Sequence, residues 1–220
     1  MRRVVFLLLI LTAPLVALGQ PGTAAQEILL QPDREVQHES ELLLAAQVIK
    51  LRLDAAGISG VQVKASSGGM VHLLLDGRQG QDISRILELA QSRAQLEFRL
   101  VKQDSRDPLS PADLEDAGFQ GQFVQQADYT FDEYTQMPLV TFIIVPDRQA
   151  EFGEFTEGSI GRRLAVVLDG VILTAPVLQG RISDNGQISG VGTLEEARTL
   201  AAQLNGGVLP FALEPVPGTP

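Results

Sequence analysis

Residues 161–210 read GRRLAVVLDGVILTAPVLQGRISDNGQISGVGTLEEARTLAAQLNGGVLP, and this stretch decides the fold. Two apolar runs, 164–168 and 171–175, flank the dipeptide Asp169-Gly170. The two-residue turn that best suits twisted strands needs a positive φ at both central residues, and Asp-Gly tolerates it. The stretch therefore predicts an antiparallel hairpin, with an exposed loop after it.

A capped amphipathic helix is expected after that loop. Thr193 and Glu196 have the spacing of a capping box, in which each side chain accepts a hydrogen bond from the backbone N–H of the other residue. Apolar residues recur at helical spacing along one stripe, namely Leu194, Ala197, Leu200, Ala201 and Leu204. Asn205 and the two glycines after it should end the helix. Nothing in 161–210 has the arrangement of a catalytic site.

The chain before this stretch begins with alternating strand and helix patterns. The expected order is β-α-β-β-α-β, with strands at 27–30, 61–65, 70–75 and 95–102 and helices at 41–56 and 83–93. This is the order of the ferredoxin-like split βαβ arrangement, an antiparallel sheet with both helices on one face. The fold class is therefore α+β.

A second unit is expected after residue 102, where the composition shifts. Residues 103–111 are polar and rich in turn formers, which is typical of a boundary. Ser110-Pro111 should begin a short helix that ends by Gly118. Residues 119–136 form a weakly patterned connection, 139–145 a buried strand, and Asp147 should cap a further helix.

Charge and composition exclude several classes of function. The 27 acidic residues outnumber the 17 lysines and arginines, so nucleic acid and anionic membrane surfaces are not expected partners. Cysteine is absent, which excludes disulfides and thiolate metal sites. The two histidines, His38 and His72, lie in contexts typical of solvated or structural side chains. Because no catalytic, metal-binding or cofactor motif is present, we expect a protein that is not an enzyme and needs no metal or cofactor.

The first 25 residues have the pattern of an export signal. Arg2 and Arg3 precede an apolar run over 4–18, and small residues suitable for cleavage follow. This run is shorter than the roughly 20 residues that a membrane-spanning helix needs. We therefore expect a cleaved signal peptide at 1–25, with an uncleaved N-terminal anchor as the alternative. The mature chain is expected to be periplasmic, with no membrane-spanning region.

Several ordered motifs resemble the first periplasmic domain of SecD, an accessory subunit of the bacterial protein translocase. They are GRRLA at 161–165, VLDG at 167–170, TAPV at 174–177, GQISG at 186–190, EEA at 195–197 and GVLP at 207–210. The segments LAAQVIKLRLDAAGISGVQV at 44–63 and AQLEFRL at 94–100 resemble the same family. The resemblance extends from about residue 39 to residue 214.

This resemblance implies a ferredoxin-like base with an inserted head. The base is expected at 26–102 plus 207–216, the head subdomain at 103–206 and a tail at 217–220. SecD continues into membrane helices that couple proton flow to export, and we expect no counterpart of their carboxylate and arginine here. A proton-driven motor role is therefore not carried over, and contact with emerging unfolded polypeptide is the implied role that remains.

Two groups of residues are candidates for binding polypeptide. The first is aromatic and lies in the weakly patterned segment: Phe119, Phe123, Tyr129, Phe131 and Tyr134. These side chains either pack the core of the head or line a groove, and the sequence leaves both open. The second group is Thr174, Pro176 and Val177. A proline is disfavoured inside a sheet, so this segment is expected at an edge with free backbone groups.

The sequence therefore leads to two main functional hypotheses. In the first, an exported SecD-like domain binds unfolded polypeptide or assists Sec-dependent protein export. In the alternative, the chain is a structural or interaction module that docks onto another envelope protein through its head. An enzyme or small-ligand binder would need a pocket with convergent polar groups, which the sequence does not show.

Overall fold

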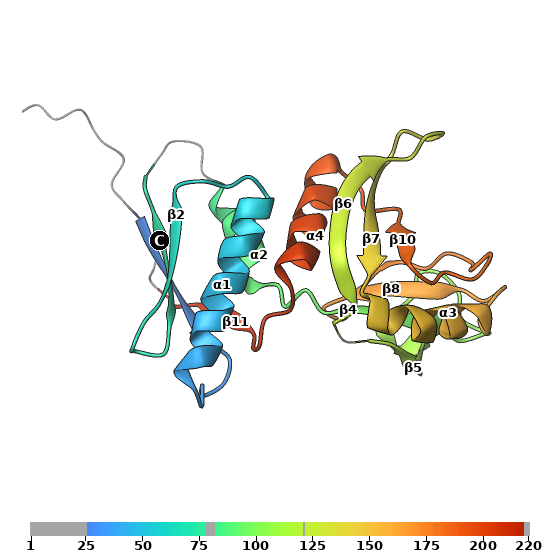
Figure 1. Cartoon of the computed structure of the whole chain (residues 1–220), viewed down its shortest axis with the longest axis horizontal. Helices are drawn as coiled ribbons and strands as arrows, with labels where there is room; N and C mark the ends of the chain where they lie inside the picture. Colours follow the sequence, from blue (N-terminus) through green and yellow to red (C-terminus); the bar gives the residue numbers. More distant parts are fainter. Residues whose placement is uncertain (1–25, 78–81, 121, 218–220) are drawn as a thin grey trace, which may run out of the picture.

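The chain forms two lobes that lie side by side (Figure 1), and the computed structural model describes residues 26–77, 82–120 and 122–217. The export signal predicted at 1–25 lies outside the described residues, as does most of the expected tail. Within the described ranges, no helix is both long enough and apolar enough to cross a membrane.

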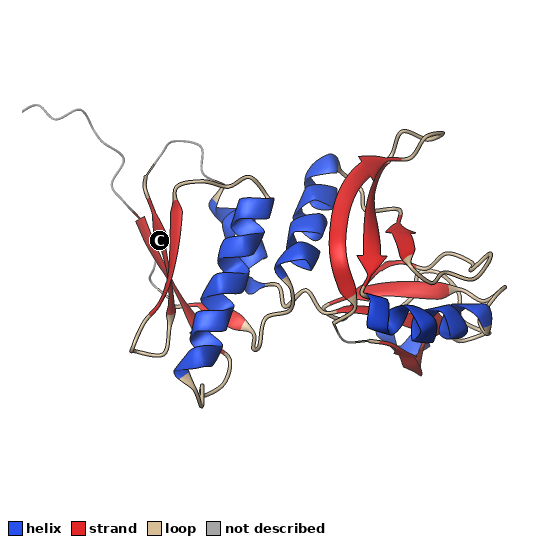
Figure 2. Cartoon of the chain, viewed as in Figure 1, coloured by secondary structure: helices blue, strands red, loops and turns tan. Residues whose placement is uncertain are grey.

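The first lobe is one antiparallel sheet with two helices on one face (Figure 2). Its strands have the order β11-β1-β3-β2. The elements are β1 (Gln26–Pro32), α1 (Glu39–Ala55), β2 (Val61–Ala65), β3 (Val71–Leu75), α2 (Ile83–Gln91) and β11 (Leu213–Pro215). Alternate residues of β3 are buried, because one face of the sheet packs against the helices. Apart from small shifts at the ends, the strands and helices predicted up to residue 93 are confirmed.

The fourth strand of this sheet is not the one that the sequence predicted. Strand β4 (Leu96–Val101) pairs in the second lobe, where Phe98 lies opposite Val166. The fourth strand of the first lobe is β11, which pairs with β1. The prediction that 95–102 completes the base sheet is therefore wrong. Its alternating pattern is that of any strand with one buried face, so the pattern predicts a strand but does not select its partner.

The second lobe contains two antiparallel sheets that share one core. One sheet has the order β5-β4-β8-β9, with β5 (Leu114–Phe119), β8 (Leu164–Leu168) and β9 (Val171–Thr174). The other has the order β10-β7-β6, with β6 (Val124–Phe131), β7 (Pro138–Ile144) and β10 (Asn185–Ile188). Two helices, α3 (Gln149–Glu157) and α4 (Leu194–Gly206), complete the lobe.

The predicted hairpin and capped helix are confirmed. Strands β8 and β9 pair around Asp169 and Gly170, whose φ angles are 49° and 82°. At the start of α4, the Thr193 hydroxyl accepts a hydrogen bond from the backbone N–H of Glu196 at 3.2 Å. The Glu196 carboxylate accepts one from the backbone N–H of Thr193 at 2.7 Å. The turn at Asp169-Gly170 and the cap at Thr193, both predicted from 161–210, are therefore present in the structure.

Three other segments differ from the prediction. The helix expected to reach Gly118 is a single 3₁₀ turn, Pro111–Asp113, and β5 follows it. The residues LEDAGF have no apolar stripe at helical spacing, and their backbone pairs with β4 instead. The expected connection at 119–136 contains β6, whose polar residues hide the strand alternation. Of the segment 207–216 expected to return to the base, only Leu213–Pro215 forms a strand, β11.

Helix α4 lies between the lobes and belongs to both cores. Ala202 packs in the core of the first lobe, whereas Leu200 and Leu204 pack in that of the second. Figure 1 shows α4 between α1 and the strand β6. A helix with two apolar faces can be buried on both sides, and this burial joins the lobes.

The fully buried Arg52 of α1 also ties the lobes together. Its guanidinium donates to the backbone carbonyls of Leu89 at 2.9 Å, Arg93 at 3.2 Å and Gly207 at 2.5 Å, and to that of Ser92. Residues 92–93 follow α2 and Gly207 follows α4, so both connections between the lobes meet at this side chain. Burial lowers the pKa of Arg52 to about 10, which leaves the guanidinium charged at neutral pH.

Candidate binding cavity in the second lobe

An apolar cavity of about 200 Å³ opens on the surface of the second lobe. It lies where the two sheets meet α3 and the loop between β9 and β10. Its inner walls come from Phe98 of β4, Phe142 of β7, Phe152 of α3 and two residues of β8. Residues 176–179 and 182 of the loop, together with β10 and its flank, surround the opening.

Three buried phenylalanine rings form the floor of the cavity. The ring centroid of Phe98 lies 5.6 Å from that of Phe142 and 5.0 Å from that of Phe152, both in tilted arrangements that aromatic rings favour. Gly186 of β10 decides where the Phe142 ring lies. A Cβ atom at this glycine would be 2.5 Å from Cζ of Phe142. The floor therefore depends on the absence of a side chain at residue 186.

The segment 176–178 forms one side of the opening and continues the pairing of β8 with β9. The carbonyl of Pro176 accepts from the N–H of Leu164 at 2.8 Å, and the N–H of Leu178 donates to the carbonyl of Arg162 at 2.8 Å. Val177 is 47% exposed at the cavity mouth. Strand β9 is the edge of its sheet as described, so the outer side of this segment has no strand beside it.

A buried hydroxyl fixes the other end of the loop. The hydroxyl oxygen of Thr156 in α3 accepts from the N–H of Ile182 at 3.0 Å. It also lies 2.9 Å from the carbonyl oxygen of Ile182. Ile182 therefore sits beside α3 at the cavity mouth. The loop has two anchors, one on β8 and one on α3, which keep the opening formed.

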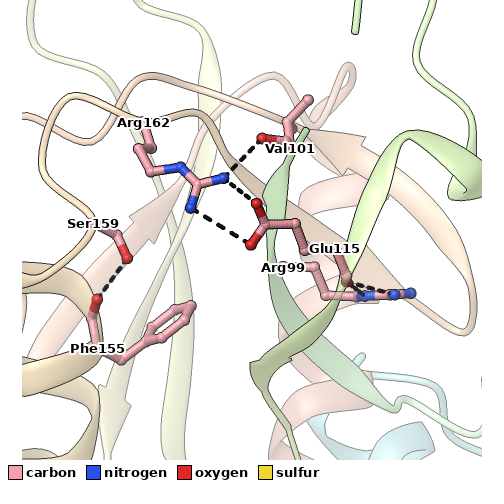
Figure 3. A network of polar contacts seen from close by, with 6 residues as sticks. All are labelled: Arg99, Val101, Glu115, Phe155, Ser159 and Arg162. Carbon is pink, nitrogen blue, oxygen red and sulfur yellow. Dashed lines mark hydrogen bonds and ion pairs between the residues drawn. The ribbon is translucent and has the colours of Figure 1, made fainter. Parts of the chain in front are cut away.

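A polar network holds the start of β8, to which the loop is paired (Figure 3). The guanidinium of Arg162 donates to the carboxylate of Glu115 in β5 and to the carbonyl of Val101 at 3.3 Å. Arg99 donates to the carbonyl of Glu115 at 2.6 Å. Because the backbone of Arg162 also accepts from Leu178, this network supports the cavity mouth from behind.

The lining residues carry no ionisable side chain. The polar ones are Gln179, Gln187 and Ser189, and all three are exposed. General acid–base or nucleophilic chemistry needs a titratable group within reach of the ligand, and these lining residues supply none. In the part of the chain that the structure describes, no group of three or more His, Cys, Asp or Glu side chains could hold a metal ion.

Side chains with a shifted pKa lie away from the cavity. Burial raises the pKa of Glu88 in α2. Hydrogen bonds from Ser110, Thr135 and Thr193 lower the pKa values of Asp113, Asp132 and Glu196, respectively. The last three are turn and capping residues whose carboxylates accept backbone N–H bonds, so their shifts reflect local structure.

The cavity brings together two of the eight residues proposed from the sequence. Pro176 and Val177 lie at its mouth, and Thr174 lies half-buried at the end of β9. Phe119 and Phe123 lie in the core, where they are 2% and 1% exposed. Their rings contact that of Phe152, with centroid distances of 4.7 and 6.4 Å, so they stand behind the cavity floor.

The other three aromatic candidates lie on the hairpin of β6 and β7. Tyr129, Phe131 and Tyr134 are 37%, 47% and 93% exposed. The guanidinium of Arg198 in α4 lies over the Tyr129 ring, 5.1 Å from its centroid. None of the three lines the cavity, so the aromatic group predicted from the sequence is divided between the core and a separate surface.

Sequence reasoning missed the residues that form the floor. Phe98 and Phe142 lie in segments predicted as strands, and Phe152 lies in a segment predicted as a helix. Each pattern predicts burial without showing that the rings of three elements meet. The glycine in the motif GQISG was available as a signal, since a glycine within a strand often marks a close approach of a neighbour.

Comparisons with known proteins place the second lobe in a family. The sequence profile described as SecDF, P1 head subdomain, matches residues 97–211, more than half of the chain. The protein translocase subunit SecDF of Thermus thermophilus is 30% identical over 91% of this chain and 31% of the relative. SecD of Aquifex aeolicus is 34% identical over 76% of this chain and 37% of the relative. The chain thus spans about a third of the length of these relatives.

Solved structures show the same fold. A crystal structure of SecDF in its super-membrane-facing form superposes with a TM-score of 0.78 at 29% identity, over 87% of this chain and 29% of that one. A second SecDF structure, of a membrane component described as enhancing protein export, gives a TM-score of 0.74 at 29% identity over 86% of this chain and 97% of that one. The matched profile covers both sheets of the second lobe, helix α4 and the residues that line the cavity. The chain therefore belongs to the SecDF P1 head family.

Proposed function

We propose that this chain is a periplasmic domain of a protein translocase accessory subunit, and that its cavity binds apolar side chains of unfolded polypeptide. The observation that carries the proposal is the cavity itself. It combines a floor of three phenylalanine rings with an uncharged lining and a mouth beside a strand edge that no other strand covers among the described residues. The similarity to SecD and SecDF supports the assignment to protein translocation.

Unfolded chains share two features that a binding site of low sequence preference can use. They expose apolar side chains, and their backbone N–H and C=O groups are unpaired by secondary structure. An extended segment lying beside residues 176–178 would pair its backbone with the free edge. Because side chains alternate along an extended segment, every second one would point toward the cavity.

The uncharged lining fits this role better than recognition of a particular sequence. Buried polar or charged partners impose strong selection, because a mismatched ligand leaves them unpaired. An aromatic and aliphatic floor accepts leucine, valine or phenylalanine with only modest differences in free energy. A cavity of about 200 Å³ offers room for one such side chain at a time.

The test is direct binding of the full chain to a reduced, alkylated and fluorescently labelled polypeptide that cannot fold. Val177→Asp places a charge at the mouth while changing a side chain that is already 47% exposed. We expect the dissociation constant to rise about tenfold, equivalent to about 1.4 kcal/mol. Leu44→Asp is the matched control, because Leu44 is 49% exposed on the first lobe.

The proposal requires that the two variants differ. Equal binding by Val177→Asp and the unchanged chain would remove the cavity mouth from the interaction. Equal loss in both variants would indicate a general effect of added negative charge. Failure of the unchanged chain to bind at about 100 μM, equivalent to about −5.5 kcal/mol, would end the proposal.

A further inference from the structure

The turn that joins β6 to β7 carries exposed apolar side chains that the cavity does not explain. The hairpin projects from the second lobe (Figure 1), and Phe131, Tyr134 and Met137 at its end are 47%, 93% and 55% exposed. A single exposed apolar residue is ordinary, but here three large ones lie within seven residues of one turn, and we call these three side chains the apolar patch. Tyr134 buries almost none of its surface, so its ring adds little to the stability of the fold.

The turn is held in one conformation by its own hydrogen bonds. The carboxylate of Asp132 accepts from the N–H of Tyr134 at 3.1 Å and from the N–H of Thr135 at 2.8 Å. The backbone N–H of Asp132 donates to the carbonyl of Met137 at 2.9 Å and closes the turn. A preordered turn loses little conformational entropy when it binds, and a rigid aromatic side chain is an efficient contact.

The charged side chains of the turn itself and of the end of β6 are all acidic. Residues 128–137 contain Asp128, Asp132 and Glu133 and no lysine or arginine. Glu133 lies next to Tyr134 and is exposed. Hydrogen bonds from Thr135 and Tyr134 hold the pKa of Asp132 below its usual value, so this carboxylate stays ionised at neutral pH.

We propose that the turn 131–137 docks into an apolar pocket bordered by lysine or arginine on a folded partner protein. A projecting patch of three side chains fits a concave surface, and its acidic border selects a basic rim. An anionic lipid surface would be repelled by the same acidic border. An unfolded chain offers no concave pocket, so it is not the expected ligand of this turn. The interaction is independent of the cavity proposed above.

The experiment is photo-crosslinking with benzoylphenylalanine in place of Tyr134, in the full chain made in its own cells. We expect one discrete protein adduct, and mass spectrometry should map the attachment point to a folded domain, next to lysine or arginine. Glu133→Lys should reduce the yield of this adduct roughly tenfold, because it places like charges together. Glu154→Lys is the matched control, since Glu154 is an exposed acid on α3, and it should leave the yield unchanged.

Two further comparisons separate this inference from the cavity hypothesis. The crosslinker at Leu51, 48% exposed on the first lobe, should not give the same adduct. Val177→Asp should leave the adduct intact, whereas it weakens binding of unfolded polypeptide. Absence of an adduct, a smear of many chains, a lipid adduct, or a discrete adduct that Glu133→Lys does not reduce would each overturn the inference.

Discussion

The two lobes differ in what fills their cores and in what lines their hollows. The core of the first lobe is aliphatic apart from Phe211, whereas that of the second contains Phe98, Phe119, Phe123, Phe142 and Phe152. The first lobe also has the larger hollow, of about 440 Å³, between the start of α1 and the turn from β2 to β3. The lining of that hollow mixes apolar residues with the charged side chains Arg34, Glu35 and Glu39, and Arg34 pairs with Glu41 at 2.6 Å.

This difference shows that size alone does not identify a binding site. Arg34, Glu35 and Glu39 keep the hollow of the first lobe solvated, and a ligand there would displace water from charges that already have partners or solvent. The smaller cavity has apolar walls whose contact with water is unfavourable. An apolar ligand would therefore gain more by burial in the cavity of the second lobe than in the hollow of the first.

The largest effect of a single substitution is expected at the joint between the lobes, which is the region around Arg52 where both connections meet. Arg52→Met keeps an unbranched side chain but removes the guanidinium that donates to the carbonyls of Leu89, Ser92 and Gly207, and one of the two donors to that of Arg93, which also accepts from the N–H of Leu209 at 3.1 Å. Loss of these charged hydrogen bonds from a buried site should lower the free energy of unfolding by about 3–5 kcal/mol. Urea denaturation monitored by circular dichroism measures the loss, and the two lobes should then unfold in separate steps.

A neighbouring lysine provides the control for this substitution. Lys50 is exposed and pairs with Asp54 on the surface of the same helix. Lys50→Met should change stability by no more than about 0.5 kcal/mol. If Arg52→Met is as mild as Lys50→Met, then the apolar faces of α4 join the lobes without help from the arginine.

The floor of the cavity should respond next most strongly, through Gly186. In Gly186→Ala the new Cβ atom would overlap the Phe142 ring, which must then move within a packed core. We expect a loss of about 1–3 kcal/mol in unfolding free energy. Binding of the unfolded polypeptide should weaken as well, because the displaced ring changes the shape of the floor.

Gly180 is the matched control for that change. It lies in the loop that leads to β10, and a Cβ atom there would meet nothing within 4 Å. Gly180→Ala should be neutral in both the unfolding and the binding measurement. A Gly186→Ala variant with unchanged binding would show that the polypeptide does not reach the floor.

Local signals predicted most of the elements but not how they are assigned to sheets. The turn at Asp169 and the cap at Thr193 depend on neighbouring residues, so the sequence contains all that decides them. The partner of β4 depends on distant contacts. The carboxylate of Asp169 accepts from the N–H of Gln95 at 2.9 Å, which holds the start of β4 beside the hairpin of the second lobe. The residue pattern of 95–102 gives no indication of that hydrogen bond.

The candidate site was only partly predictable for a similar reason. Pro176 indicated an edge because proline lacks an N–H, and this argument needs a single residue. The cavity floor needs rings from three elements at once, and Phe98, Phe142 and Phe152 are far apart in the chain. The aromatic residues of 119–134 are close in sequence but not in environment, because Phe119 and Phe123 face inward and Tyr134 faces solvent.

The smallest expected effect is at the surface of the joint. Arg85 of α2 pairs with Glu195 of α4 at 2.6 Å, but Glu195 is half exposed and also lies 4.0 Å from Arg198 on its own helix. A double-mutant cycle with Arg85→Gln and Glu195→Gln should give a coupling of about 0.2–1 kcal/mol that falls as salt is added. A larger coupling that does not depend on salt would show that charge rather than apolar burial orients the lobes. In that case the exposed ion pair, like the buried Arg52, would help to hold the lobes together.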